Sequence, residues 1–436
     1  MVRRAKGADA GLSRDQRAFV YRTMYTSRRL DDVEIGMKRL NQIFFQISGA
    51  GHEATLVAAA LHLKGGHDWF FPYYRDRALC LGIGVTPKEM LLQGVGAAAD
   101  PASGGRQMPS HWGHQALNIP SQSSCTGTQF LNAVGCAEMG IRAQNLSPET
   151  QSKLTFATDE VVYVSSGDGT TSEGEFSEAL NTACNLKLPV LFHIEDNGYA
   201  ISVPIEVQTA GGSISQMLAG YPDLLILEFD GCDPEESSLA WEKAVAHARA
   251  RKGPVLLHSH VVRPYSHSMS DDERLYRSED EREDDAKRDP VGTYRGRLIA
   301  EFGFSEDELK AIEDEVDGEL RQAKDEALEA PTPAPESALE YVYSPSIDPT
   351  SSSFETEPVQ GEDTQAKTMV DLINSCLKEE MRRDERVIVF GEDVADASRE
   401  EVLPKVKGEG RVENPVSTEL ALEPRSHLKD SALALH

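Results

Sequence analysis

Two polar residues in this sequence, the acid Asp168 and the amide Asn197, each follow an apolar run and could together do chemistry. The run at 161–165 leads into a Gly-Asp-Gly turn that holds Asp168, and the run at 190–194 leads into the turn that holds Asn197. Carboxylate, amide and main-chain carbonyl oxygens are hard ligands suited to Mg²⁺ shared with phosphates. Glycines beside the acid let the backbone approach a bulky anion, and a following helix would offer N–H groups. We interpret the pair as a site for Mg²⁺ and a diphosphate.

The elements that must position this pair read as a strand, a helix and a second strand. Ser172 and Glu175 have the spacing of a capping box, which predicts that the helix starts there. An apolar stripe at helical spacing follows: Phe176, Ala179, Leu180, Ala183 and Cys184. The two strands should be parallel neighbours whose carboxyl ends meet at one edge of a sheet. The alternative is that Asp-Gly and Asn-Gly are ordinary turns, which would explain either dipeptide alone.

Strand and helix patterns alternate in the rest of the chain as well. Apolar runs that end in turns recur at 224–233 and 253–263, and a helical pattern from 234 to 251 separates them. Helical spacing also marks 12–40 and 293–330. This alternation predicts an α/β fold with a doubly wound, mostly parallel sheet.

The stretch from 167 to 197 resembles the thiamine-diphosphate motif, which begins Gly-Asp-Gly and closes further along with Asn. More narrowly, the sequence is similar to the α subunit of the decarboxylating component of 2-oxo acid dehydrogenase complexes. The resemblance implies a thiamine-diphosphate-binding fold, with thiamine diphosphate and Mg²⁺ as cofactors. It implies that the metal is held by Asp168, Asn197 and the main chain of Tyr199. The diphosphate would lie along Gly167, Gly169 and Thr170.

Two further segments match the same family. Tyr74 and Arg75 in HDWFFPYYRDR could be a packing residue and a surface cation, but the resemblance implies that they grip the cofactor's phosphates. The Arg fork is suited to that role. The charged segment 263–290 reads as a solvated loop, and it carries the family pattern Arg-x-x-x-His-Ser-x-Ser-Asp-Asp. The resemblance implies that His267 faces the reactive carbon of thiamine and that Arg263 serves the same reacting end.

The histidines and a serine in and near this loop raise two further questions, a metal site and a phosphorylation site. His258, His260 and His267 are close in sequence, but the first two share a strand face and the third lies in the loop. That arrangement disfavours one metal site built from all three. Ser268 matches the residue that is phosphorylated in mitochondrial relatives.

A Ser/Thr cluster at 121–128 opens a helix of small residues, and helix entry alone would explain it. The resemblance implies that the main chain of Ser124 and Thr126 contacts the aminopyrimidine side of thiamine. It also implies a structural K⁺ at Ser123, Thr128 and Gln129. The Arg-Gln-Met-Pro run at 106–109 resembles branched-chain members of the family more than pyruvate members.

Composition limits the partners and the compartment. The 436 residues include 44 basic and 72 acidic side chains, with a formal net charge of −28, which argues against nucleic acid or anionic membrane as a main partner. Six scattered cysteines without a CxxC pair favour a reduced cytoplasmic protein with no cysteine-bound structural zinc. No signal-peptide pattern or apolar run of membrane-span length is present, so we expect neither secretion nor membrane insertion.

The C-terminal part of the sequence indicates a linker followed by a second, incomplete domain. We predict an α-type domain at 1–330, a Pro/Ser/Thr-rich linker at 331–365, the start of a β-type domain at 366–407 and an unassigned tail at 408–436. Helical spacing marks 368–381, and RVIVFGEDVA at 386–395 reads as a strand that resembles the opening of the family's β subunit. The chain therefore resembles an α–β fusion with an incomplete β-type α/β domain.

The resemblance implies oxidative decarboxylation of a small branched-chain 2-oxo acid such as 3-methyl-2-oxobutanoate, with acyl transfer to a lipoyl carrier. The partners would be a β subunit or second protomer and the lipoyl-bearing acyltransferase component, and we expect the isolated chain to catalyse poorly. One alternative is a pyruvate dehydrogenase component. A second is a non-catalytic cofactor-binding or assembly subunit, because most of β is missing. A third is a plain nucleotide-binding α/β protein, which fits the Gly-Asp-Gly turn but not Asn197.

Overall fold

The computed structural model describes residues 11–340, 342–344, 346–348, 350–352 and 367–388. They divide into two compact units. The larger unit contains the described residues up to 141 and those from 156 to 339. The smaller unit contains 142–155 and the described residues from 340 onward.

A parallel sheet forms the centre of the larger unit. Its strand order is β1-β2-β3-β7-β6, and every pairing in it is parallel. The strands are β1 (Trp69–Phe71), β2 (Val162–Gly167), β3 (Val190–Asp196), β7 (Val255–His260) and β6 (Leu225–Asp230). The predicted α/β fold with a mostly parallel sheet is confirmed. A separate antiparallel pair, β4 (Tyr199–Ala200) with β5 (Val203–Pro204), follows β3.

The register brings the carboxyl ends of the middle strands to one edge. Gly167 of β2 lies opposite Glu195 of β3, and Asp196 of β3 lies opposite His260 of β7. Every residue of β2 and β3 is buried, because helices cover both faces of the sheet. The polar residues that follow these strands are therefore held by a rigid, fully covered support.

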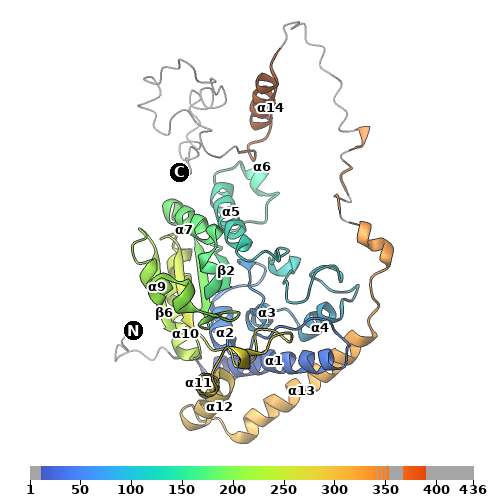
Figure 1. Ribbon diagram of the computed structural model, residues 1–436. Helices are drawn as coiled ribbons and strands as arrows, with labels where there is room; N and C mark the ends of the chain where they lie inside the picture. Colours follow the sequence, from blue (N-terminus) through green and yellow to red (C-terminus); the bar gives the residue numbers. More distant parts are fainter. Residues whose placement is uncertain (1–10, 341, 345, 349, 353–366, 389–436) are drawn as a thin grey trace. The chain divides into compact units, whose positions relative to one another are not determined.

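Helices pack on both faces of the sheet, as Figure 1 shows. The larger core joins one sheet face to the following helices: α1 (Arg14–Arg39), α2 (Glu53–His62), α3 (Arg77–Ile83), α4 (Pro87–Val95), α10 (Pro234–Arg249), α12 (Pro290–Ala300) and α13 (Glu306–Glu329). The second core joins the other face to α5 (Thr128–Ala143), α7 (Gly174–Leu186) and α9 (Ile214–Met217). Alternate strand residues enter each core, for example Tyr163 the first and Val164 the second. This two-sided covering is the doubly wound arrangement.

Short elements complete the connections. They are α8 (Ile205–Gln208), α11 (Glu279–Lys287) and five 3₁₀ turns among the described residues (Gln115–Leu117, Asp168–Ser172, Ala210–Gly212, Glu273–Leu275 and Pro335–Leu339). In the smaller unit, α6 (Pro148–Gln151) and α14 (Met369–Arg383) are the helices that the structure describes. Beyond α14, the Glu385 carboxylate accepts a hydrogen bond from Ser147 Oγ at 2.6 Å. The helix predicted at 368–381 is present.

Three expectations about local structure were wrong. Ser172 is not a helix cap: it ends a 3₁₀ turn that begins at Asp168, and α7 starts later, after Glu173, with no side-chain cap. The single helix expected over 293–330 is two helices, because Gly303 adopts a left-handed φ of 72° between them.

The charged segment 263–290 is also not all loop, since it contains α11. This helix buries no residue, so it has no apolar stripe to mark it in the sequence. Instead, the helix begins with a capping box between Ser278 and Glu281. An ion pair joins Asp285 of this helix to Arg277, which precedes it.

The strand predicted at 386–395 falls mostly outside the described residues, and 386–388 are not strand. The tail at 408–436 also lies outside them. None of the helices in the described part of the chain has both the length and the apolar character needed to cross a membrane.

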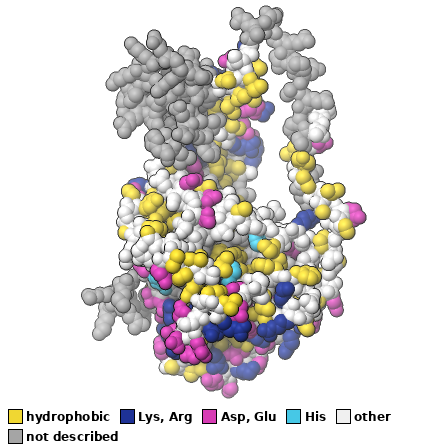
Figure 2. All heavy atoms as spheres, viewed as in Figure 1, with side chains coloured by type: hydrophobic (Ala, Val, Ile, Leu, Met, Phe, Trp, Pro, Cys, Tyr) yellow, Lys and Arg dark blue, Asp and Glu magenta, His cyan; other side chains and the backbone are white. Residues whose placement is uncertain are grey.

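Charged side chains of both signs cover the surface helices. Figure 2 shows Lys and Arg interspersed with Asp and Glu over the region where Figure 1 draws α11, α12 and α13. Arg295 of α12, for example, pairs with Glu306 of α13 at 2.8 Å. Such exposed pairs each contribute little, and they fit a surface of mixed charge.

Candidate active site

The predicted metal ligands follow neighbouring strands, and the structure brings their backbones together. Asp168 is only 1% exposed, and its Oδ2 accepts a hydrogen bond from Gln208 Nε2 at 2.8 Å. Burial raises the pKa of Asp168 to about 7, and the nearby charge of Asp196 adds to the rise. The main-chain N–H groups of Asp168 and Asn197 and the Arg263 cation oppose it. A buried carboxylate with so little compensating positive charge is suited to bind a cation.

The turn after β3 presents Asn197 and Tyr199. Asn197 Oδ1 accepts the N–H of Tyr199 at 3.2 Å, and its Nδ2 lies 3.4 Å from Nε2 of His52. Gly198 has a φ of 79°, and a Cβ placed on it would meet nothing within 4 Å. The turn therefore faces open space and needs glycine for its backbone conformation. The Tyr199 hydroxyl donates to Glu281 at 2.8 Å, which ties the turn to α11.

The two glycines beside Asp168 are explained by packing. A Cβ on Gly169 would lie 2.6 Å from the Cβ of Ala200 in β4, and one on Gly167 would lie 3.0 Å from the Tyr73 hydroxyl. Close packing therefore favours glycine at both positions even without a ligand. That these glycines also admit a diphosphate remains a prediction. Thr170, the other predicted diphosphate contact, is buried in the same 3₁₀ turn.

Arg75 and His267, which are far apart in the sequence, are in direct contact. Arg75 is buried, and its Nη2 lies 3.1 Å from Nδ1 of His267 and 3.2 Å from the carbonyl oxygen of His267. Its Nη1 donates to the carbonyl of Ser48 at 2.5 Å. The ring of Tyr74 stands edge-on to the His267 ring, with 6.2 Å between centroids, and its hydroxyl accepts from Tyr73 at 2.6 Å. The structure therefore joins the predicted phosphate-binding pair to the predicted reacting histidine.

Burial and the contact with Arg75 together determine the protonation state of His267. Burial, then the Arg75 and Arg263 cations, lower the pKa of His267 to about 4, while Asp271 opposes the shift. The imidazole is neutral at pH 7. Because a guanidinium can only donate, Nδ1 must accept from Arg75 and the ring proton must lie on Nε2.

Arg263 forms the far side of this cluster. It is 2% exposed, its Nη1 donates to the carbonyl of Ile201 at 3.0 Å and its Nη2 donates to Tyr276 Oη at 2.7 Å. Tyr276 in turn donates to Asp271, whose carboxylate also accepts the main-chain N–H of His267 at 2.9 Å. Burial lowers the pKa of Arg263, and the Arg75 charge adds to that effect. Two buried arginines with few acidic partners form a local positive field suited to an anion.

The Ser/Thr cluster before α5 makes mostly local contacts. Ser124 Oγ is 2.9 Å from Nε2 of His111, whereas Ser123 Oγ accepts the N–H of Cys125 at 3.1 Å. Thr126 is exposed, and Thr128 is the first residue of α5. Gln129 uses its amide oxygen on the N–H of Gly127 and its amide nitrogen on the carbonyl of Ser165, both at 3.1 Å. Ser123 and Gln129, two of the three predicted K⁺ ligands, thus use their side chains on different main-chain groups.

Sequence reasoning missed a buried polar network beneath Asn197. His52 Nδ1 lies 2.6 Å from Glu195, and its other nitrogen faces Asn197. Burial and the neighbouring Asp76 raise the pKa of Glu195 well above its ordinary value, and burial lowers that of His52 well below it. Asp76 accepts from Tyr163 at 2.8 Å. The available signal was a histidine and two acids in the apolar strand 190–196, which a fully buried strand must satisfy by hydrogen bonds.

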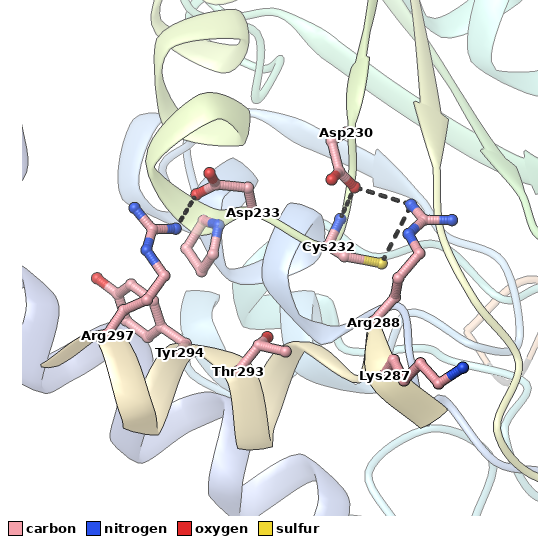
Figure 3. Close-up of a pocket in the computed structure, with 9 residues that line it drawn as sticks. Asp230, Cys232, Asp233, Lys287, Arg288, Thr293, Tyr294 and Arg297 are labelled. Atoms are coloured by element: carbon pink, nitrogen blue, oxygen red, sulfur yellow. Dashed lines mark hydrogen bonds and ion pairs between the residues drawn. The ribbon is translucent and has the colours of Figure 1, made fainter. Parts of the chain in front are cut away.

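A cavity of about 210 Å³ lies elsewhere, between the β6–α10 connection and the segment 287–297 (Figure 3). Four of its charged side chains pair with one another: Arg288 with Asp230 at 3.0 Å and Arg297 with Asp233 at 2.9 Å. None of the predicted site residues lines it. We therefore place the candidate active site at the strand ends and not in this cavity.

Comparison with known proteins identifies the class. The family described as dehydrogenase E1 component matches residues 21–336, so the chain belongs to this family of thiamine-diphosphate-dependent oxidoreductases. The match includes β1 to β7 and all the predicted site residues.

The individual proteins to which the chain is similar are named as α subunits of 2-oxoisovalerate or 3-methyl-2-oxobutanoate dehydrogenases. The chain is 39% identical to the 2-oxoisovalerate dehydrogenase subunit alpha of Bacillus subtilis over 336 residues, which cover 76% of this chain and 97% of that protein. It is 31% identical to the 3-methyl-2-oxobutanoate dehydrogenase subunit alpha of Mycobacterium tuberculosis over 326 residues, 74% of this chain and 81% of that protein. It is 29% identical to the human mitochondrial 2-oxoisovalerate dehydrogenase subunit alpha over 336 residues, 77% of this chain and 72% of that protein.

Proposed function

We propose that this chain is the α-type subunit of a thiamine-diphosphate-dependent dehydrogenase that decarboxylates branched-chain 2-oxo acids. The observation that carries the proposal is the placement of Asp168 and Asn197 at the adjacent ends of β2 and β3, beside the Arg75–His267 contact. The names of the similar proteins support the substrate class, since they are 2-oxoisovalerate and 3-methyl-2-oxobutanoate dehydrogenase subunits. The Arg-Gln-Met-Pro run at 106–109 points the same way.

The residues present fit Mg²⁺ and a diphosphate. The high pKa of Asp168 marks a buried carboxylate in need of a cation, and Asn197 and the main chain of Tyr199 would complete the oxygen ligands. The Nε atoms of Arg75 and Arg263 are buried and have no hydrogen-bond partner among the described residues. Buried N–H groups without a partner are costly, and an anion would satisfy them.

Each polar residue would then have one task. When bound, thiamine diphosphate would supply the nucleophilic carbon and the electron sink that decarboxylation requires. Arg75, with Tyr74 against it, binds phosphate oxygens and holds Nδ1 of His267. His267, kept neutral, carries its proton on Nε2, from which it can pass to a reacting oxygen and return during acyl transfer to a lipoyl carrier. Arg263 stabilises negative charge at the same end.

The wider assembly follows from the same proposal. A β subunit or a second protomer would close the cofactor site, and a lipoyl-bearing acyltransferase would receive the product. The resemblance of 386–395 to a β subunit supports an α–β fusion, with the boundaries 330, 365 and 407 given above. A K⁺ ion at Ser123, Thr128 and Gln129 and a cytoplasmic location remain predictions.

Calorimetric titration of the full chain with thiamine diphosphate and Mg²⁺ tests the cofactor assignment. We expect binding that requires Mg²⁺, and no binding either by the chain alone or with an added β subunit would contradict the cofactor assignment. Decarboxylation of 3-methyl-2-oxobutanoate and of pyruvate, with an artificial electron acceptor, then tests the reaction with and without an added β subunit. Cofactor binding without turnover under both conditions would identify a non-catalytic assembly subunit.

A further inference from the structure

A second group of metal-ligating side chains lies beside the candidate active site. His258 and His260 project from the same face of β7, with ring centroids 4.5 Å apart, and Asp196 reaches them from β3. Asp196 Oδ2 is 2.9 Å from Nε2 of His258 and 3.6 Å from Nδ1 of His260. One ligand atom from each residue lies within 4.8 Å of the other two. We propose that Asp196, His258 and His260 bind a divalent transition-metal ion of the zinc class.

The spacing fits such an ion with little movement. Zinc binds imidazole nitrogen and carboxylate oxygen at about 2.0–2.2 Å, so its ligand atoms lie roughly 3–4 Å apart. His258 and Asp196 are almost completely buried, and they form the fixed part of the site. His260 has a side chain that is 42% exposed, so its ring can turn to close the third distance. Three protein ligands leave an open position, which water can reach from the exposed side.

The surroundings hold both imidazoles in the orientation that metal binding needs. His258 uses its other nitrogen, Nδ1, on Ser215 Oγ at 2.7 Å, and His260 uses its other nitrogen, Nε2, on Glu228 at 2.8 Å. Histidines that bind a metal through one nitrogen usually donate the other N–H to a hydroxyl, carbonyl or carboxylate, which determines the tautomer. Here both rings already have that partner, and both remaining nitrogens face Asp196.

The carboxylate is prepared for the same role. Asp196 Oδ1 accepts the N–H of Gly198 at 2.9 Å, which leaves Oδ2 for the histidines.

Ligand chemistry separates this site from the proposed Mg²⁺ site. Imidazole nitrogen suits zinc, copper, iron and nickel, whereas Mg²⁺ prefers oxygen ligands. Asp168, Asn197 and Tyr199 offer only oxygen, while two of the three ligands here are imidazoles. The inference does not depend on thiamine diphosphate and stands or falls separately from the proposed function.

The test uses the full chain, stripped with a chelator and kept in millimolar Mg²⁺ to occupy oxygen sites. Zinc binding is measured by isothermal titration calorimetry and by the zinc-induced rise in melting temperature. The variant is His260→Gln, because His258 is buried and its replacement risks misfolding. The matched control is His67→Gln: His67 is also partly exposed and lies 2.8 Å from a carboxylate, that of Asp159.

We expect one zinc per chain, weakened by about tenfold or more in His260→Gln and unchanged in His67→Gln. Co²⁺ provides an independent readout, since its visible absorption in the wild-type chain should be lost only in His260→Gln. Equal zinc affinity in the wild type and His260→Gln, equal loss in both variants, or no zinc binding by the wild type would each overturn the assignment. In those cases the three side chains form only a hydrogen-bonded ion-pair network.

Discussion

Replacing Asp168 with Asn should have opposite effects on the protein without and with its cofactor. The carboxylate is buried beside Asp196, and its pKa is raised from 3.8 to about 7. Ionisation therefore opposes folding as the pH rises from about 4 to 7, because the native state holds the proton that the unfolded chain has lost. At pH 8 a shift of that size corresponds to about 4 kcal/mol, which we halve to about 2 kcal/mol to allow for relaxation of the site.

Asn keeps the shape and can still accept the hydrogen bond from Gln208, but it carries no charge. We expect Asp168→Asn to raise the melting temperature of the ligand-free protein by about 2–3 °C, since an unfolding entropy of about 2.1 cal/mol/K per residue makes 1 kcal/mol correspond to roughly 1–1.5 °C in a chain of 436 residues. The free energy of unfolding of the wild type should rise by ~2.7 kcal/mol when thiamine diphosphate and Mg²⁺ are present at a hundred times their dissociation constant. The variant should gain much less, because its neutral amide oxygen attracts Mg²⁺ far more weakly than the Asp168 carboxylate does.

Differential scanning calorimetry at pH 8, with and without the two cofactors, measures both effects. Asp223→Asn serves as the control, because Asp223 is exposed and should change neither value. A variant that melts lower than wild type without ligand, yet keeps the full cofactor-induced rise, would refute both the electrostatic reasoning and the metal assignment.

Three further predictions follow from individual contacts. Arg75→Lys should weaken thiamine diphosphate binding at least about tenfold, because Lys cannot reproduce the fork that bonds His267 and that we propose to bind phosphate; titration calorimetry showing unchanged affinity would exclude Arg75 from the site. His267 has a folded-state pKa of about 4, below the unfolded value of 6.5, so its contribution to stability is complete above pH 6.5 and is lost as the pH falls toward 4. Urea unfolding of His267→Asn should therefore vary less between pH 7 and 5 than unfolding of wild type, and an identical dependence would refute the assignment. Asp68→Asn should cost about 1.5–3 kcal/mol in urea unfolding, because it removes the buried carboxylate that the partly exposed Arg249 bonds at 2.6 Å; a loss below about 1 kcal/mol would show that the pair contributes little.

The sequence by itself determined the sheet, its parallel direction and the position of the polar turns along the chain. Apolar runs of strand length, separated by helical stripes, leave few ways to bury both kinds of surface. Asp168 and Asn197 could be selected for that reason, since each follows a buried strand. Local signals were less dependable: Ser172 had the spacing of a cap but lies in a 3₁₀ turn, and α11 has no apolar face to reveal it.

Only the tertiary structure decided which side chains meet across the chain. The contact of Arg75 with His267, the buried network of His52 and Glu195, and the group formed by Asp196 with His258 and His260 all join residues from different elements. Strand register and loop path set these distances, and both depend on the packing of the whole sheet and not on any local pattern. The two histidines of β7 could be seen to share a face, but the carboxylate between them comes from a neighbouring strand. Sequence spacing within one element therefore cannot reveal it.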